Sequence, residues 1–435
     1  MLLRFRVSNH RSLRDEQELS LVAVPRRGEQ AAAGPIPPTV RVAGIYGANA
    51  SGKSNVLHAL GYFFRAVRDS YAQWGVAGGI PRQPFLLDPA ARNQPSMYEI
   101  DIASDGIRYT YGFRVNDERV CLEWLHSYHA RSRKRVLFRR EKDEFYFGRS
   151  LSGPNAAIAR LVRKNALYLS VAAASSHPML GPLCSELGAH SQEIVELGQG
   201  HPKVPILARL ALAYDQLRPK VDSWLRFADL GISGSELEKP DLTDEQSKWW
   251  NERAHGGGGV EDKDADELAR NAYFGKLRLL HGRGPKDAPV ALPFESESTG
   301  TQIWLAVLVE VEPTLRWGGV ALVDEVDSSL HPRLSAALIQ MFKDPVINPK
   351  NAQLIFTSHD VSLLGGLIED EILSRDEVWF TEKGDDGATA MFPLSDFHPR
   401  RGENFERAYL QGRYGAVPYV DIAELRRLFD RKVPS

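Results

Sequence analysis

The sequence is poor in cysteine, with Cys121 and Cys184 as its two cysteines in 435 residues. They stand far apart, outside any CxxC pair and without a histidine at ligand spacing, so neither a disulfide framework nor a cysteine-based zinc site is indicated. Long apolar runs are also missing, because no stretch approaches the roughly 18 consecutive apolar residues of a membrane span. Charges recur every few residues in the opening MLLRFRVSNHRSLRDE. We therefore expect a cytoplasmic protein in a reducing compartment, without a membrane partner.

An excess of either charge is missing as well: 54 Lys and Arg residues face 56 Asp and Glu residues, for a formal net charge of -2. No bulk positive charge is available to hold nucleic acid, so such a contact would need a local patch. The one dense basic run is RSRKRVLFRREK, residues 131–142. We interpret this run as a solvated hairpin, with a DNA-binding stripe as the alternative.

What the sequence does contain is 43% hydrophobic residues, enough for a buried core in a chain of two or three domains. Alternating apolar and polar residues predict β-strands in much of 1–150. Residues 151–275 have helical apolar spacing, broken by four glycines at 256–259, and predict an inserted helical region. Near-continuous apolar strands alternate with helices in 276–400, which is typical of a parallel sheet covered on both faces. With 401–435 as a tail, the predicted fold class is α/β.

The segment GIYGANASGKSN, residues 44–55, lies between a strand-like apolar run and a helical one. Four positions separate its second glycine from Gly-Lys-Ser, which is the spacing of a phosphate-binding loop. Backbone N–H groups of such a loop bind phosphate oxygens, the lysine reaches the β- and γ-phosphates, and the serine hydroxyl ligates Mg²⁺. ATP and Mg²⁺ are therefore the expected cofactors. The candidate nucleotide-binding residues are Gly47, Asn49, Gly52, Lys53, Ser54 and Asn55.

Two further apolar strands end in side chains that suit phosphoryl chemistry. The strand in GVALVDEVDSSLHP ends at Asp324 and Glu325, and the strand in LIFTSHD ends at His359. Ligands of α/β sheets bind beyond the carboxyl ends of the strands. Asp324 is predicted to hold Mg²⁺ through water and Glu325 to orient and deprotonate the attacking water. His359 is predicted to contact the transferring phosphoryl oxygens and to sense their loss.

The order of these motifs, with ESTGTQ ahead of the strand that ends at Asp324, resembles the ABC-type ATPases of the SMC and RecF class. The resemblance implies an ABC-type ATPase head, with lobes at 1–150 and 276–400, that sandwiches nucleotide against a second head. It implies that Ser298 and Gly300 belong to the signature motif that contacts the γ-phosphate held by the partner head, although Glu297 stands where leucine is usual. It also implies a D-loop at VDSSLH, in which Asp327 couples the two sites.

The opening FRVSNHRSL resembles the F-x-V-x-N-F-R-S start of the same class. The resemblance makes Asn9 and Arg11 candidates near the phosphates, with an ordinary surface turn as the alternative. Gln83, in PRQPFLLDP, is the candidate for the glutamine loop that approaches the metal. A solvated loop residue is the alternative for Gln83.

The chain resembles, more specifically, the compact stand-alone ATPases of bacterial phage-defence and abortive-infection operons, which are related to the OLD family and the RloA group. The segments that carry this resemblance are GIRYTYGFRV, CLEWLH and FERAYLQGRYGAVPYV, the last containing Arg413-Tyr414-Gly415. OLD nucleases continue into an acidic Toprim metal site, whereas EKGDDG here predicts a hairpin turn. An Arg/His nuclease pair of the PrrC type is not found near His398. We therefore expect no effector within this chain.

The function expected from these motifs is that of an ATP-driven dimer switch or sensor in anti-phage defence. It would control a separately encoded effector, expected to be a nuclease, and would form a homodimer or higher homo-oligomer through its ATP sites. A RecF-like repair ATPase that clamps DNA is the alternative. A non-catalytic nucleotide-dependent scaffold is the third class, and the presence of Glu325 argues against it.

Overall fold

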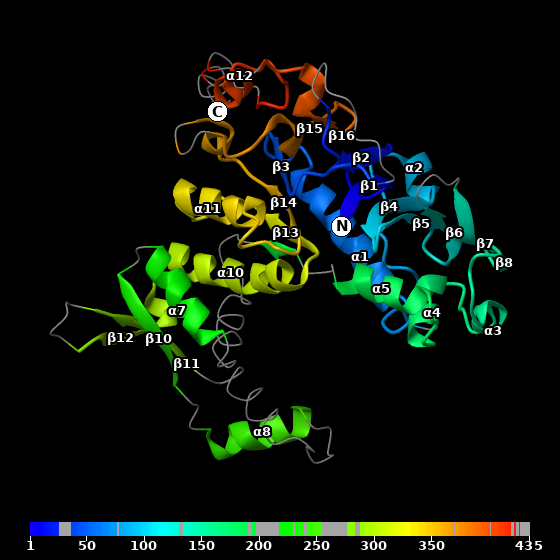
Figure 1. Ribbon diagram of the computed structural model, residues 1–435, viewed down its shortest axis with the longest axis horizontal. Coiled ribbons are helices and arrows are strands. Elements are labelled where there is room, and N and C mark those ends of the chain that lie inside the picture. The colour runs from blue at the N-terminus through cyan, green and yellow to red at the C-terminus, as the bar shows by residue number, and fades with distance from the viewer. Residues whose placement is uncertain are drawn as a thin grey trace, which may run out of the picture. The chain divides into compact units, whose positions relative to one another are not determined.

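The chain folds into two compact units. The N–C unit comprises Leu2–Gly188 and Thr357–Ser435, and the middle unit comprises Ala189–Phe356 together with Met1. Among the described residues, no helix has both the length and the hydropathy that a membrane crossing requires. The computed structural model, shown in Figure 1, describes residues 1–25, 36–75, 78–129, 134–189, 194–196, 217–228, 231–238, 242–254, 276–282, 288–366, 368, 371–400, 402–418, 422 and 426.

A seven-stranded antiparallel sheet forms much of the N–C unit, in the order β2-β1-β4-β5-β6-β7-β8. The strands predicted in much of 1–150 are confirmed, in the segments LLRFRV, SMYEIDIAS, IRYTYGFRV and RVLFRREKDEFYFGRS. β6 is an additional strand that the sequence did not predict. Its buried positions include the polar residues Glu123 and Ser127, so apolar and polar residues do not alternate along it. The bounds are β1 (Leu2–Ser8), β2 (Gln17–Ser20), β4 (Ser96–Ser104), β5 (Ile107–Val115), β6 (Val120–Tyr128), β7 (Arg135–Glu141) and β8 (Glu144–Phe147).

Buried Glu123 holds the sheet to a helix that follows it. Its carboxylate accepts hydrogen bonds from the N–H groups of Tyr168 at 2.7 Å and Leu169 at 3.0 Å, where α4 begins. Arg140, also buried, lies 3.7 Å away. Burial raises the pKa of Glu123 while the Arg140 charge opposes that rise. The pair is therefore a structural cap for α4.

The helices of the N–C unit pack on this sheet through aromatic side chains. Phe63 of α1 stacks on Phe113 of β5 with ring centroids 5.6 Å apart and meets Phe5 of β1 edge-on at 6.2 Å. Large apolar rings of this kind contribute most of the buried area in a core. The helices are α1 (Lys53–Asp69), α2 (Pro89–Asn93), α3 (Asn155–Ala159), α4 (Tyr168–Ala174) and α5 (Leu180–Ala189).

The same unit contains β3 (Val42–Gly47), which is buried along its whole length. It pairs in parallel with β15 (Val378–Lys383), and β15 forms an antiparallel hairpin with β16 (Thr389–Pro393). The hairpin turn predicted at EKGDDG is confirmed. The remaining elements of the unit are α12 (Phe405–Leu410) and the short 3₁₀ helices η2 (Val361–Leu364), η3 (Arg375–Glu377) and η4 (Leu394–Phe397).

The middle unit contains the other parallel strands. β13 (Val320–Asp324) pairs in parallel with β14 (Gln353–Thr357), whose last residue is assigned to the N–C unit, and with the short β9 (Val195–Glu196). The near-continuous apolar sequences of β13 and β14 are buried, as a covered parallel sheet requires. The helices next to them in sequence are α10 (Thr299–Trp317) and α11 (Pro332–Lys343), which confirms the predicted strand–helix alternation.

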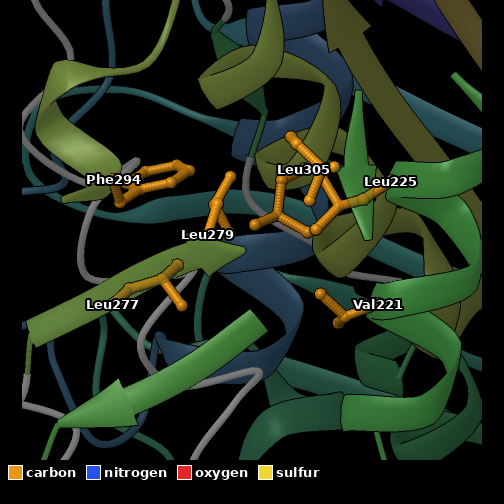
Figure 2. Packing of buried hydrophobic residues seen from close by; sticks show 7 residues of the cluster. Val221, Leu225, Leu277, Leu279, Phe294 and Leu305 are labelled. Carbon is orange, nitrogen blue, oxygen red and sulfur yellow. The ribbon is translucent and has the colours of Figure 1, made fainter. Parts of the chain in front are cut away.

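A three-stranded antiparallel sheet completes the middle unit, in the order β10-β11-β12. Figure 2 shows its core, in which Leu277 and Leu279 of β11 pack with Val221 and Leu225 of α7 and with Leu305 of α10. The strands of β11 and β12 match the predictions, whereas β9 and β10 lie in the region 151–275 that was expected to be helical. Residues 197–216 of the predicted helical region lie outside the described residues. The bounds are α7 (Arg218–Phe227), α8 (Asp244–Ala254), β10 (Ile232–Glu238), β11 (Lys276–His281), β12 (Val290–Pro293) and η1 (Phe294–Ser296).

The sequence did not predict β10, and its composition explains why. Its sequence ISGSELE contains one glycine, two serines and two glutamates, residues that favour turns or helices more than strands. It becomes a strand by pairing with β11, which follows it much later in the chain, so non-local pairing decides its structure.

Candidate functional site

The phosphate loop has the strand–loop–helix context that its sequence predicts. β3 ends at Gly47, the loop turns through residues 48–52, and α1 begins at Lys53. Gly47 and Gly52 have φ angles of 155° and 110°, in a region that side chains rarely adopt. A Cβ at Gly47 would collide with the carbonyl oxygen of Thr381, and one at Gly52 with the hydroxyl of Thr389. Glycine is therefore required at both positions, because the side chains of Thr381 and Thr389 already pack against the loop backbone there.

Lys53 reaches back across this loop. Its Nζ donates to the carbonyl oxygens of Gly47 at 3.0 Å and Ala48 at 3.2 Å, and the residue is 5% exposed. Ser54 and Asn55 follow in the first turn of α1 and are half-buried, while Asn49 is exposed. A cation and a helix N-terminus thus meet at one loop, which is the donor set that a phosphate chain requires.

Arg11 and Gln83 lie beside the same helix start. The Arg11 N–H donates to the Gln83 carbonyl at 2.7 Å, and its guanidinium Nε donates to the Gln83 side-chain oxygen. Another guanidinium nitrogen lies 3.4 Å from Asn55 Oδ1, and Asn55 donates to Ser12 Oγ at 2.6 Å. Arg11 has a φ of 49°, an unusual conformation for a side-chain-bearing residue that costs of order 1–3 kcal/mol. The structure therefore brings together Arg11, Gln83 and Asn55, three residues chosen from separate motifs.

Asn9 has a different role from the one considered for it. Its Nδ2 donates to the carbonyls of Ala91 and Gln94, both at 2.7 Å, and its Oδ1 accepts from the N–H of Phe85 at 2.9 Å. Asn9 is 4% exposed. Its side chain is used in full to hold the segment 85–94, so Asn9 anchors the loop that contains Gln83.

The β15–β16 hairpin holds the phosphate loop from the other side, through residues that the sequence did not single out. The Thr389 hydroxyl donates to the Ser51 carbonyl at 2.7 Å and lies 2.8 Å from Ser12 Oγ. Ser51 Oγ lies 2.7 Å from Thr381 Oγ1. No local pattern could have marked these threonines, because the contacts form only when the hairpin packs on a loop far earlier in the chain.

His359 lies in the same unit as the phosphate loop. Ser358, which follows β14, donates its N–H to the Ile45 carbonyl of β3 at 3.2 Å. His359 is exposed, and the next residue, Asp360, caps η2 by accepting from the Ser362 N–H at 2.9 Å. In the chain, His359 thus stands between a residue bonded to β3 and a residue that caps η2.

The predicted catalytic carboxylates are at the end of β13 in the middle unit. Asp324 is the last residue of that strand, and both Asp324 and Glu325 are half-buried. Glu325 has a φ of 54°, and its carbonyl accepts from the Ser328 N–H at 2.7 Å, so the chain turns sharply at this residue. Among the described residues, no group of three or more His, Cys, Asp and Glu side chains forms a metal cage. Mg²⁺ at a nucleotide site needs one or two carboxylates and phosphate oxygens, not such a cage.

The residues predicted to form the signature and the D-loop lie close together within the middle unit. Ser298 is the N-cap of α10 and accepts from the Thr301 N–H at 3.1 Å. A Cβ at Gly300 would lie 2.9 Å from the carbonyl oxygen of Ser329, two residues after Asp327. Ser329 itself has a φ of 59°. Gly300 therefore permits a close approach between the two motifs.

Glu297, which departs from the usual leucine of the signature, has a specific partner. Its carboxylate lies 2.7 Å from Nε2 of His281 on β11. The neighbouring Phe294 belongs to the core cluster of Figure 2. The three-stranded sheet is thus tied to the start of the signature by one polar pair and one apolar cluster. His281 carried no motif signal, since the pairing depends on the fold.

The basic run at 131–142 does not form a uniform stripe. Arg140 is 1% exposed, and its Nη1 donates to the Ala166 carbonyl at 2.6 Å. Arg139 is exposed and pairs with Glu141 at 3.1 Å. Residues 130–133 lie outside the described residues. In the part that is described, Arg140 has a structural role, which favours the hairpin interpretation over the DNA-binding one.

The Arg413-Tyr414-Gly415 segment packs on the hairpin strands. The Tyr414 ring stacks on Phe380 of β15 with centroids 5.6 Å apart, and its hydroxyl donates to Glu403 at 3.0 Å. Arg413 lies 2.6 Å from the same carboxylate. Burial and the Glu403 carboxylate raise the pKa of Tyr414 to about 12. This segment therefore stabilises the β15–β16 side of the N–C unit.

A cavity of about 1250 Å³ lies elsewhere in the N–C unit. Residues that precede and follow η4 in the sequence line this cavity, among them Arg375, His398 and Arg400. No residue of the phosphate loop is among those that line it, so this cavity is distinct from the candidate nucleotide site.

Comparison with known proteins identifies the family of this chain. The family model described as "AAA domain, putative AbiEii toxin, Type IV TA system" matches residues 42–164 and 213–365, more than half of the chain. The Septu protein PtuA of Bacillus mycoides (strain KBAB4) is 28% identical over 168 residues, which are 34% of this chain and 22% of that protein. The match therefore spans about a fifth of the length of that relative.

Two solved structures were also found to be similar. One is the Smc head domain with an extended coiled coil bound to the C-terminal domain of ScpA, derived from Pyrococcus furiosus, with 14% identity over 91% of this chain and 97% of that chain and a TM-score of 0.33. The other is the recombination mediator protein RecF-ATPrS of the RecFOR pathway, with 13% identity, coverage of 90% and 98%, and a TM-score of 0.31. Both scores are below 0.5, so the fold description rests on the strands, helices and loop of this chain.

Proposed function

The chain belongs to the family of AAA domains described as putative AbiEii toxins of type IV toxin–antitoxin systems, and from this premise we propose that it binds and hydrolyses ATP with Mg²⁺. The observation that carries the proposal is the phosphate loop. Gly47 and Gly52 permit its turn with φ angles of 155° and 110°, Lys53 crosses it, and Arg11 and Gln83 meet beside the first turn of α1. These donors suit the charge and shape of a triphosphate.

The residues would divide the chemistry as follows. Loop N–H groups and Lys53 would bind the phosphates, and Lys53 would exchange its two carbonyl partners for phosphate oxygens. The Ser54 hydroxyl and the Asp324 carboxylate would hold Mg²⁺, which supplies positive charge against the phosphates. Glu325 would accept a proton from the attacking water, and His359 would donate to a phosphoryl oxygen. Gln83, through its bond to Arg11, would report the state of this site.

We propose further that two copies of the chain join through their nucleotides. Ser298 and Gly300 of one copy would contact the γ-phosphate bound by the other, and Asp327 would couple the two sites. The close approach of Gly300 to the Ser329 carbonyl supports this proposal, because it joins the signature to the D-loop within one unit. A two-fold dimer of this kind uses the same surface on both copies.

The proposed role of this cycle is to control a separately encoded effector in phage defence. Asp386, which could have belonged to a metal site, is used by the hairpin: it pairs with Arg14 at 2.7 Å and accepts from the Ala388 N–H at 3.0 Å. These contacts lower the pKa of Asp386. The hairpin geometry supports a separate effector, expected to be a nuclease, over a metal centre at this turn.

Lys53→Ala tests the ATP site. It removes the cation that crosses the loop, so we expect ATP binding and Mg²⁺-dependent phosphate release to fall to background. Lys383→Ala is the matched control, because Lys383 is an exposed lysine of the same unit. The measurements are ATP affinity by equilibrium binding and phosphate release with Mg²⁺ or with chelator. Equal turnover in wild type and Lys53→Ala would overturn the proposal.

A further inference from the structure

Two exposed leucines lie next to the candidate nucleotide site. Leu86 and Leu87 are 67% and 72% exposed, although the residue before them, Phe85, is buried. Leu87 lies against Gly387 at the tip of the β15–β16 hairpin, where a Cβ would collide with its Cδ1. Exposed single leucines are common, but an adjacent pair on a surface made of two segments indicates an interaction site.

Acidic side chains lie on the segments that contact the leucine segment, which are the hairpin turn and the residues next to Arg14. Asp385 and Asp386 adjoin Gly387 in the hairpin turn, and both are exposed. Arg14 links Asp386, at 2.7 Å, to Asp15, at 2.8 Å, while its guanidinium lies 5.7 Å from the centre of the Phe85 ring. Asp15 and Glu16 are also exposed, and Arg14 pairs with two carboxylates of the cluster, Asp15 and Asp386. Two exposed basic residues lie near the cluster in sequence: Lys383 precedes the hairpin turn, and Arg92 follows the two leucines.

Both halves of this surface are bonded to the phosphate loop region. The leucine segment begins after Gln83, which accepts two hydrogen bonds from Arg11. The hairpin is held to the loop by the Thr389 hydroxyl, which donates to the Ser51 carbonyl at 2.7 Å. A change in the bound phosphates that moves Arg11 or the loop would therefore change how the two halves meet.

We propose that Leu86, Leu87 and the acidic residues Asp15, Glu16, Asp385 and Asp386 form a docking surface for a protein partner. The partner segment would present apolar side chains flanked by Lys and Arg. Charge complementarity selects this occupant, because the carboxylates attract a basic segment and repel the phosphates of nucleic acid. The inference deepens the proposed function by assigning the surface through which the ATPase would contact its effector.

The test uses the full chain and two fluorescent peptides of equal length and leucine content, one alternating Leu with Lys and the other alternating Leu with Glu. Without nucleotide, we expect the Lys peptide to bind at least ten times more tightly than the Glu peptide. Leu86→Ser/Leu87→Ser should weaken Lys-peptide binding at least tenfold, and Asp385→Lys/Glu16→Lys should reverse the preference. Leu161→Ser is the matched control, since Leu161 is 60% exposed in the same unit.

Three outcomes would overturn the docking surface. They are equal binding of both peptides, Lys-peptide binding unchanged by the leucine variants, and tighter binding of a single-stranded DNA 20-mer that the same variants abolish. A further result to examine is self-association of the wild type and of Leu161→Ser that is absent in Leu86→Ser/Leu87→Ser. That result would assign the surface to a second copy of the chain and would also contradict the proposal. ATP turnover is measured separately on the same proteins and should be unchanged in the leucine variants. An inactive wild type would contradict the proposed ATPase, whereas the nucleotide-free peptide comparison decides the docking surface.

Discussion

At the scale of single residues, Glu325 combines an unusual backbone with the role proposed for it. Its φ of 54° lies in the left-handed region, at a cost of order 1–3 kcal/mol for a side chain of this kind. The residue follows the last residue of β13, so the strained turn fixes a carboxylate at the edge where ligands of α/β sheets bind. The turn positions the carboxylate but does not by itself assign its role, because Asp105 and Lys142 have similar φ angles in hairpin turns.

Glu325→Gln should keep the shape of this side chain and remove its ability to accept a proton. We expect ATP affinity near that of wild type and a loss of phosphate release of roughly 10²- to 10⁴-fold. Equilibrium binding and single-turnover phosphate release measure the two quantities separately. Glu118→Gln, an exposed glutamate in the N–C unit, is the control. Turnover at the wild-type rate in Glu325→Gln would show that another group activates the water.

The sequence allowed prediction of the residues that belong to compact motifs. The phosphate loop predicts Lys53 and Ser54 from spacing alone, and the opening segment predicts Arg11. The sequence did not indicate Thr389, because its hydrogen bonds to Ser51 and Ser12 join segments far apart in the chain. Threonine is common in strands, so its presence in the sequence does not predict a contact with the phosphate loop.

At the scale of elements, the β15–β16 hairpin acts as a support for the phosphate loop. Thr389→Val removes the hydroxyl that donates to the Ser51 carbonyl while keeping the volume of the side chain. Leaving this acceptor without its donor costs about 1–2 kcal/mol, so ATP affinity should fall roughly 5- to 30-fold. Thr389→Ser keeps the hydroxyl and should bind ATP nearly as wild type does. Titration of ATP into the three proteins measures the effect, and equal affinities would exclude the hairpin as a support.

The pair of His281 and Glu297 connects a second element, the three-stranded sheet, to the signature. His281→Ala leaves the Glu297 carboxylate without its partner at 2.7 Å. We expect ATP binding by one copy to stay near wild type and ATP-driven association to weaken several-fold. Glu297→Leu restores the residue usual in the signature, so the double variant should associate better than His281→Ala alone.

A double-mutant cycle in the Glu325→Gln background provides the measurement for this pair. Association constants of the four proteins with ATP, from sedimentation, should give a coupling free energy of at least about 0.5 kcal/mol between His281 and Glu297. Strictly additive effects of the two changes would contradict a positioning role for His281.

Elements with a clear local pattern were predictable, and those made by distant pairing were not. β13 and β14 have apolar sequences that are buried on both faces, so their sequences suffice. β6 lacks a clear alternation of apolar and polar residues, because Glu123 and Ser127 are buried. β10 consists largely of residues that favour turns, and its strand structure depends on pairing with β11. The domain boundaries proposed at 150, 275 and 400 remain predictions. The chain passes from one compact unit to the other after Gly188 and after Phe356.

At the scale of the whole molecule, the proposed machinery is distributed over both units. The phosphate loop, Arg11 and His359 belong to the N–C unit, whereas Asp324, Glu325 and the signature belong to the middle unit. In the proposed cycle, ATP would join these groups within one copy and across two copies. The central claim is therefore that the γ-phosphate controls association.

Sedimentation of the Glu325→Gln protein tests this claim most directly. With ATP and Mg²⁺, the account predicts a species of twice the mass of the 48.5 kDa chain, because bound ATP persists when the water-activating carboxylate is removed. ADP, or no nucleotide, should give the smaller species, and adding Lys53→Ala should abolish the ATP effect. An unchanged mass with ATP, with ADP and without nucleotide would contradict the account.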